Sequence, residues 1–193
     1  MNTAPPRLRR AYFESRYGQL HVHNAIPVGG GFDELTTLIC LHGSVGTGRQ
    51  FLEISKHLGS SRSIYSPDLP GCGESDAALT KLDIAGFAGA VGDFLDSMRF
   101  RQVDLLGVGT GSAVAAELAI SRPKVVRKVC LLGSPGKDAV DPTARGAQAL
   151  RDAGAAWQSD RRQLIQQPVL SLDPAADISA VEALAAKLVG FLV

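Results

Sequence analysis

The sequence predicts an α/β fold in which helices cover both faces of a mostly parallel sheet. Short apolar runs typical of buried strands alternate along the chain with longer segments whose apolar residues have helical spacing. Several of these apolar runs end in glycine-rich turns, and ligands bind at such strand ends in sheets of this kind. A length of 193 residues with 45% hydrophobic residues is sufficient for one such domain with its own core.

Composition argues against several classes of partner. The formal net charge is +1, so there is no electrostatic basis for binding nucleic acid or an anionic membrane. No apolar segment approaches membrane-spanning length, and no hydrophobic region follows the early arginines, so we expect no signal peptide. Cys40, Cys72 and Cys130 have no metal-binding spacing. We therefore predict a cytoplasmic protein with no structural metal and no cofactor.

The amino-terminal part is predicted to be a disordered arm over residues 1–9, followed by two strands over residues 10–15 and 20–26. His21 and His23 alternate with a valine, which places both imidazoles on one face of the second strand. Two interpretations stay open. The pair could begin a metal site, although the sequence shows no third ligand, or it could lie on a half-exposed edge strand, which we favour.

The remainder of the single domain, residues 10–193, continues the alternation of strands and helices. A glycine cluster near residue 30 is predicted to be a flexible loop. Further strands are expected at 35–41, 63–65, 102–106, 125–132 and 168–172, and helices at 50–58, 84–100, 112–121, 144–164 and 180–188.

Three motifs occur where predicted strands end. The first is His42-Gly43-Ser44, and the second is the Gly/Pro-rich loop that begins at Asp68 and contains Cys72. The third is a strand–turn–helix segment with alternating glycines, Gly107-Val108-Gly109-Thr110-Gly111. Because parallel strands present their carboxyl ends at one edge, we expect all three motifs at a single mouth.

In their order and spacing these motifs resemble the α/β-hydrolase superfamily, and the resemblance covers about residues 10 to 135. It implies a nucleophile elbow of pattern G-x-S-x-G, in which Gly109 stands where the family has its serine. It also implies oxyanion donors at the backbone N–H groups of Ser44 and Thr110, beside His42 and Gly43. Residues 133–167 lie where the family inserts a lid, here shortened.

The resemblance also implies catalytic groups that the sequence does not clearly supply. Asp173 or Asp177 could provide the acid, but no histidine follows His57 in these 193 residues. The family's last strand is missing as well, unless residues 191–193 begin it. A Ser44–His42 pair is conceivable as an improvised dyad, whereas we expect His42 to order its own loop. Thr110 and Ser112 flank the elbow, and Cys72 is expected to be an inert thiol.

Three hypotheses follow. The chain is a hydrolase-like protein without hydrolytic activity that binds a small acyl or ester-like ligand; or it is an enzyme that uses other residues; or it is an incomplete or inactivated form of an active hydrolase. In the third case a partner chain could supply the missing strand. The late strand would otherwise be an exposed edge, which favours a homo-oligomer.

Overall fold

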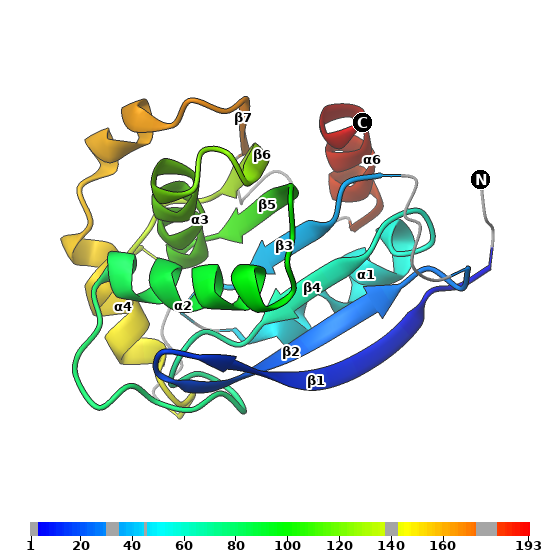
Figure 1. The fold of residues 1–193 in the computed structure, drawn as a ribbon. Helices are drawn as coiled ribbons and strands as arrows, with labels where there is room; N and C mark the ends of the chain where they lie inside the picture. Colours follow the sequence, from blue (N-terminus) through cyan, green and yellow to red (C-terminus); the bar gives the residue numbers. More distant parts are fainter. Residues whose placement is uncertain (1–3, 30–34, 45, 138–142, 173–180) are drawn as a thin grey trace.

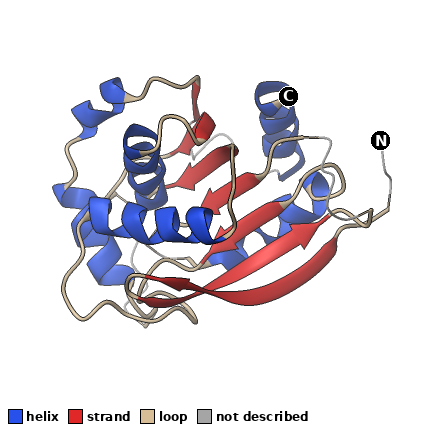
Figure 2. Cartoon of the chain, viewed as in Figure 1, coloured by secondary structure: helices blue, strands red, loops and turns tan. Residues whose placement is uncertain are grey.

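A computed structural model shows a seven-stranded sheet flanked by helices (Figure 1; Figure 2). The structure describes residues 4–29, 35–44, 46–137, 143–172 and 181–193. The strand order is β1-β2-β4-β3-β5-β6-β7. β1 and β2 pair antiparallel with each other and β2 with β4, and every other neighbouring pair is parallel. The predicted mostly parallel α/β sheet is confirmed.

Most elements begin and end within a few residues of their predicted limits. The strands are β1 (Arg7–Ser15), β2 (Gly18–Ile26), β3 (Leu38–Leu41), β4 (Ile64–Pro67), β5 (Val103–Val108), β6 (Val126–Leu132) and β7 (Val169–Leu172). The helices are α1 (Leu52–Leu58), α2 (Ile84–Ser97), α3 (Thr110–Ser121), α4 (Ala147–Ala156) and α6 (Val181–Leu192), with short 3₁₀ helices η1 (Gly48–Phe51) and η2 (Ser159–Leu164). Two predicted helices are therefore each divided into an α-helical and a 3₁₀ part.

The amino-terminal hairpin differs from the prediction in two ways. β1 begins at Arg7, so the last three residues of the predicted arm belong to a strand. The reason is the length of the antiparallel ladder, in which Arg7 pairs with Ile26 and Ser15 with Gly18. β2 is also not an edge strand, because β1 lies on one side of it and β4 on the other.

The core consists of two apolar layers, one on each face of the sheet. Alternation along the strands separates them: Leu105 packs into one layer and the next residue, Leu106, into the other. The first layer is closed by α2, α3 and α4, and the second by α1 and α6 (Figure 1). The central strand β5 is covered on both sides, which fixes the position of the turn that follows it.

In the described part of the chain, β7 forms one edge of the sheet and β1 forms the other. Phe191 and Leu192 belong to helix α6, so the suggestion that residues 191–193 begin a last strand is wrong. Lys128 Nζ donates hydrogen bonds to the carbonyl oxygens of Phe191 and Val193 at 2.7 and 2.8 Å. Cations stabilise a helix at this end because the carbonyls carry partial negative charge.

Within the described residues, no helix combines the length and the hydropathy that crossing a bilayer would require.

Candidate active site at the strand ends

The turn after β5 has the backbone of a nucleophile elbow. β5 ends at Val108, Gly109 has φ 55° and ψ −121°, and α3 begins at the next residue. The two flanking positions require glycine because neighbouring backbone leaves no room for a Cβ atom. A Cβ on Gly107 would lie 2.5 Å from the carbonyl oxygen of Gly111, and a Cβ on Gly111 would lie 2.2 Å from that of Leu41. The elbow is therefore complete as backbone but carries no reactive side chain at its tip.

The hydroxyl groups around the elbow are buried and hydrogen-bonded. Ser112 Oγ lies 2.8 Å from the carbonyl oxygen of Gly107 and 3.0 Å from that of Leu132, to which it can donate. Ser44 Oγ and Thr110 Oγ1 are 3.1 Å apart. The structure thus brings the side chains of the two predicted oxyanion residues together, and their hydroxyl groups connect the loop to the helix. The role of their backbone N–H groups stays a prediction.

His42 is held by the backbone at both ring nitrogens. Its Nε2 accepts a hydrogen bond of 2.9 Å from the N–H of Leu69, so Nδ1 carries the proton and donates to the carbonyl oxygen of Gly43 at 2.8 Å. A nitrogen that already accepts a backbone hydrogen bond is not available to take a proton from Ser44. The geometry favours the loop-ordering interpretation of His42 over the Ser44–His42 dyad.

The loop after β4 is organised by the buried carboxylate of Asp68. Asp68 Oδ1 accepts from the N–H of Gly48 at 2.6 Å, and Oδ2 accepts from the N–H of Glu74 at 3.1 Å. Within this loop Cys72 is only 2% exposed, and burial raises the pKa of its thiol to about 12. The prediction that Cys72 is an inert thiol agrees with this environment, because the thiolate is the reactive form.

Helix α4 covers one side of the mouth. A Cβ on Gly154 would lie 2.6 Å from Thr110 Cγ2, so the helix rests directly on the start of α3. A Cβ on Gly146 would meet the carbonyl oxygen of Gly71 at 2.5 Å. Beside this contact lies a cavity of about 370 Å³ whose lining includes Thr47 and Gly73.

Comparison with known proteins agrees with this architecture. A family model described as the alpha/beta hydrolase fold matches residues 36–175. The chain belongs to the α/β-hydrolase family. A 2-hydroxymuconate semialdehyde hydrolase from a Pseudomonas species is 32% identical over 133 residues, which are 66% of this chain and 46% of that protein. A pimeloyl-[acyl-carrier protein] methyl ester esterase of Neisseria meningitidis is 28% identical over 138 residues, which are 70% of this chain and 52% of the esterase.

The chain spans about half the length of these two curated relatives. Among solved structures, a carboxylesterase of Bacillus subtilis, CesB, has a TM-score of 0.63 at 18% identity. That match covers 86% of this chain and 73% of the carboxylesterase, and at this identity it supports the fold.

The predicted acid residues of this family member, Asp173 and Asp177, lie outside the described residues. The fourth histidine, His57, lies exposed on α1 and away from the three motifs. Among the described histidines, His42 directly follows β3 at the mouth, and both of its ring nitrogens are already hydrogen-bonded to backbone groups.

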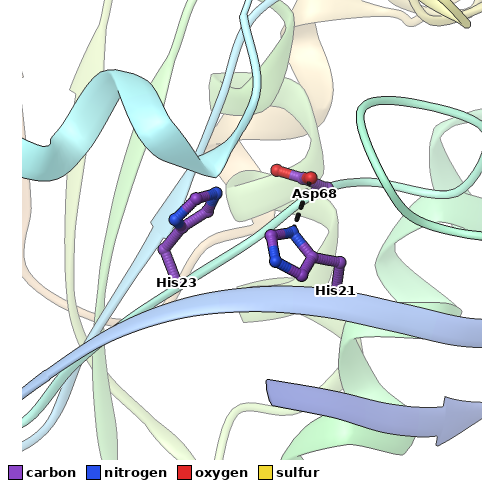
Figure 3. Close-up of side chains that lie close together, drawn as sticks. All are labelled: His21, His23 and Asp68. Atoms are coloured by element: carbon purple, nitrogen blue, oxygen red, sulfur yellow. Dashed lines mark hydrogen bonds and ion pairs between the residues drawn. The ribbon is translucent and has the colours of Figure 1, made fainter. Parts of the chain in front are cut away.

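The structure brings together one cluster of side chains that the sequence analysis did not connect. His21 Nδ1 lies 3.0 Å from Asp68 Oδ2, and the ring of His23 lies beside that of His21 with the centroids 4.7 Å apart (Figure 3). His21 is 4% exposed. The statement that the two histidines lack a third ligand is therefore wrong. The His-x-His alternation was the only signal, because the link to Asp68 depends on how β2 pairs with β4.

Proposed function

We propose that this member of the α/β-hydrolase family does not hydrolyse substrates by the family's nucleophilic route, and that it binds a small acyl or ester-like ligand at the strand-end mouth. The observation that carries the proposal is Gly109, which occupies the tip of an otherwise complete elbow. Acyl transfer by this architecture needs a nucleophile and a base that removes its proton. Glycine supplies neither group.

The neighbouring side chains offer no evident substitute. The hydroxyl of Ser112 is directed at backbone carbonyls, and those of Ser44 and Thr110 lie against each other inside the protein. Cys72 is buried and protonated at neutral pH. When a member of a catalytic triad is removed, the oxyanion hole and substrate binding still accelerate the reaction about 10³–10⁴-fold over water. If this chain retains its oxyanion donors, we expect an acceleration no larger than that.

The backbone at Gly109 explains why glycine is tolerated there. A side chain at φ 55° and ψ −121° is strained, by roughly 1–3 kcal/mol for residues held in sparsely populated regions, whereas glycine adopts them freely. An enzyme that attacks through this position has to accept that strain. A protein that only binds its ligand there gains stability from glycine.

Two observations support an acyl or ester-like ligand. Ser44 and Thr110 meet at the mouth, and backbone N–H groups at these positions would bind a carbonyl oxygen whether or not a nucleophile is present. The pimeloyl-[acyl-carrier protein] methyl ester esterase is named for a substrate of this kind.

Turnover is tested with p-nitrophenyl butyrate and with a fluorophosphonate probe that labels activated serines. We expect no saturable turnover and no covalent label for the natural chain. We also expect none for Gly109→Ser, because restoring the hydroxyl does not supply a base. Saturable turnover by the natural chain that disappears in Ser44→Ala would overturn the proposal and favour an enzyme that uses other residues.

Binding is tested separately by saturation-transfer NMR with methyl butyrate. Gly109→Ala introduces backbone strain without bulk, and Gly109→Phe introduces the same strain together with a ring at the mouth. We expect the ligand signal to persist in Gly109→Ala and to disappear in Gly109→Phe. An equal signal in both variants would show that the ligand does not bind at the elbow.

A further inference from the structure

We propose that His21, His23 and Asp68 form a binding site for a divalent transition-metal ion of the Zn²⁺ type. The three residues lie outside the elbow and have no part in the proposed ligand binding. One ligand atom from each of them lies within 4.8 Å of the other two. Among the described residues this is the one such group of three.

The sheet positions these side chains. β2 presents His21 and His23 on one face because alternate residues of a strand point the same way. β2 pairs antiparallel with β4, with Val22 opposite Pro67, so the residue after β4 lies beside His21. The N–H of Asp68 donates to the carbonyl oxygen of His21 at 2.8 Å, which fixes the two backbones relative to each other. The three side chains converge on a common point (Figure 3).

The spacing is close to what a metal ion requires. Zn–N and Zn–O bonds of about 2.0–2.2 Å place tetrahedral ligands roughly 3.3 Å apart. His21 Nδ1 and Asp68 Oδ2 are already 3.0 Å apart. A nitrogen of the half-buried His23 lies within 4.8 Å of both atoms, so the His23 side chain would have to move closer to bind the same ion.

The donor set suits the proposed class of ion. Two imidazoles and one carboxylate are ligands that Zn²⁺ shares with other late first-row metals, and they leave a fourth position open. An ion bound at His21 Nδ1 would take the place of the contact with Asp68: the neutral imidazole would carry its one proton on Nε2, and the carboxylate would become a metal ligand. A cavity of about 320 Å³, lined in part by His23, Gly48 and Arg49, adjoins the cluster and gives solvent access to it.

The carboxylate is held in place before any ion binds. Asp68 accepts hydrogen bonds from the N–H groups of Gly48 and Glu74. Both of these segments come close to Asp68 at a glycine, Gly48 in one and Gly73 in the other. A Cβ on Gly73 would lie 2.2 Å from Asp68 Oδ2, so only glycine fits there. Hydrogen bonds from outside the ligand set orient metal ligands in this way.

Positive charges nearby set an upper limit on affinity. Arg10 lies opposite His23 in the β1–β2 ladder, and Arg49 lines the adjoining cavity. Both guanidinium groups repel a cation at the site. Removing one of these two charges should therefore strengthen metal binding. A histidine–aspartate pair that binds no metal would show no such effect.

The test uses the full chain with Zn²⁺ by calorimetry and Co²⁺ by visible absorption, whose ligand-field bands report the coordination. We expect one ion per chain, and an increase of the melting temperature with Zn²⁺ concentration because the ion binds the folded state. His23→Ala should weaken binding at least tenfold. His57→Ala, an exposed histidine on α1, is the matched control and should leave binding unchanged.

Arg49→Gln should strengthen Zn²⁺ binding several-fold, because it removes a positive charge without removing a ligand. The proposal would be overturned by the absence of stoichiometric binding, or by binding that His23→Ala and His57→Ala weaken equally. These outcomes are independent of Gly109, so the metal site and the proposed ligand binding can fail separately.

Discussion

The elbow after β5 and the His21–His23–Asp68 cluster are opposite cases in one molecule. At the elbow the backbone is complete and the reactive side chain is absent. At the cluster the side chains are present, with His21 and His23 on strand β2 and Asp68 directly after β4. The difference shows that the close packing of a loop and the chemistry of its side chains are separate requirements. Gly107 and Gly111 are fixed by contacts that remain necessary whether or not a nucleophile stands between them.

The largest effect is expected from Asp68→Ala, which removes the carboxylate of the cluster. Its oxygens accept from the N–H groups of Gly48 and Glu74 and lie 3.0 Å from His21 Nδ1, so the variant leaves buried donors without acceptors. We expect a loss of about 3–5 kcal/mol in the free energy of unfolding, because each buried donor that loses its acceptor costs about 1–3 kcal/mol. Urea denaturation measures it. A loss below about 1 kcal/mol would show that water replaces the carboxylate.

A smaller effect is expected from Gly111→Ala, which tests the backbone of the elbow. The new Cβ would meet the carbonyl oxygens of Leu41 and His42 at 2.2 and 2.5 Å, so β3 and α3 would have to separate. We expect a loss of about 1–3 kcal/mol from overpacking.

Gly190→Ala is the matched control for that variant, because a Cβ there meets nothing within 4 Å. Gly190 lies in helix α6, where alanine should stabilise by up to about 1 kcal/mol. Equal effects of the two substitutions, measured by urea denaturation, would contradict the view that the elbow glycines are held by contact.

The smallest effect concerns two buried thiols, Cys72 in the loop after β4 and Cys40 within β3. Burial raises the pKa of Cys40 and of Cys72 to about 12. With such a pKa only about one thiol in ten thousand is ionised at pH 8, so alkylation by iodoacetamide should be far slower in the native than in the urea-unfolded protein.

The same thiols give a pH dependence of stability. In the unfolded chain they ionise near pH 8.5, and in the folded chain only near about 12, so above pH 8.5 the folded state holds more protons. The free energy of unfolding should therefore decrease as the pH rises above about 8.5. Rapid labelling of Cys72 at pH 8 in the folded protein would contradict this environment and reopen its role as a nucleophile.

The sequence was informative where local pattern and chain geometry coincide. Apolar runs that end in glycine turns predicted the strand ends correctly, and His42, Asp68 and Gly109 each directly follow the last residue of a strand. The inert thiol of Cys72 could be anticipated because no base adjoins it in the sequence. These features depend on the few residues around each motif.

Features that depend on strand pairing could not be predicted from the sequence. The contact between His21 and Asp68 requires the antiparallel register of β2 on β4, which no local pattern specifies. For the same reason β2 was expected at an edge, and β1 was expected to start after Arg7 rather than at it. The hydrogen bond from the N–H of Leu69 to His42 likewise joins loops that are distant in the sequence.

The packing of α4 against Thr110 affects how fast a ligand can enter the mouth. With Gly154 in direct contact with Thr110, the helix and an incoming molecule compete for that side of the mouth. Only those protein molecules in which α4 has shifted would admit a ligand there, and the apparent dissociation constant would rise in inverse proportion to their fraction. Changes that loosen this helix should therefore accelerate association while the intrinsic affinity of the open form stays the same.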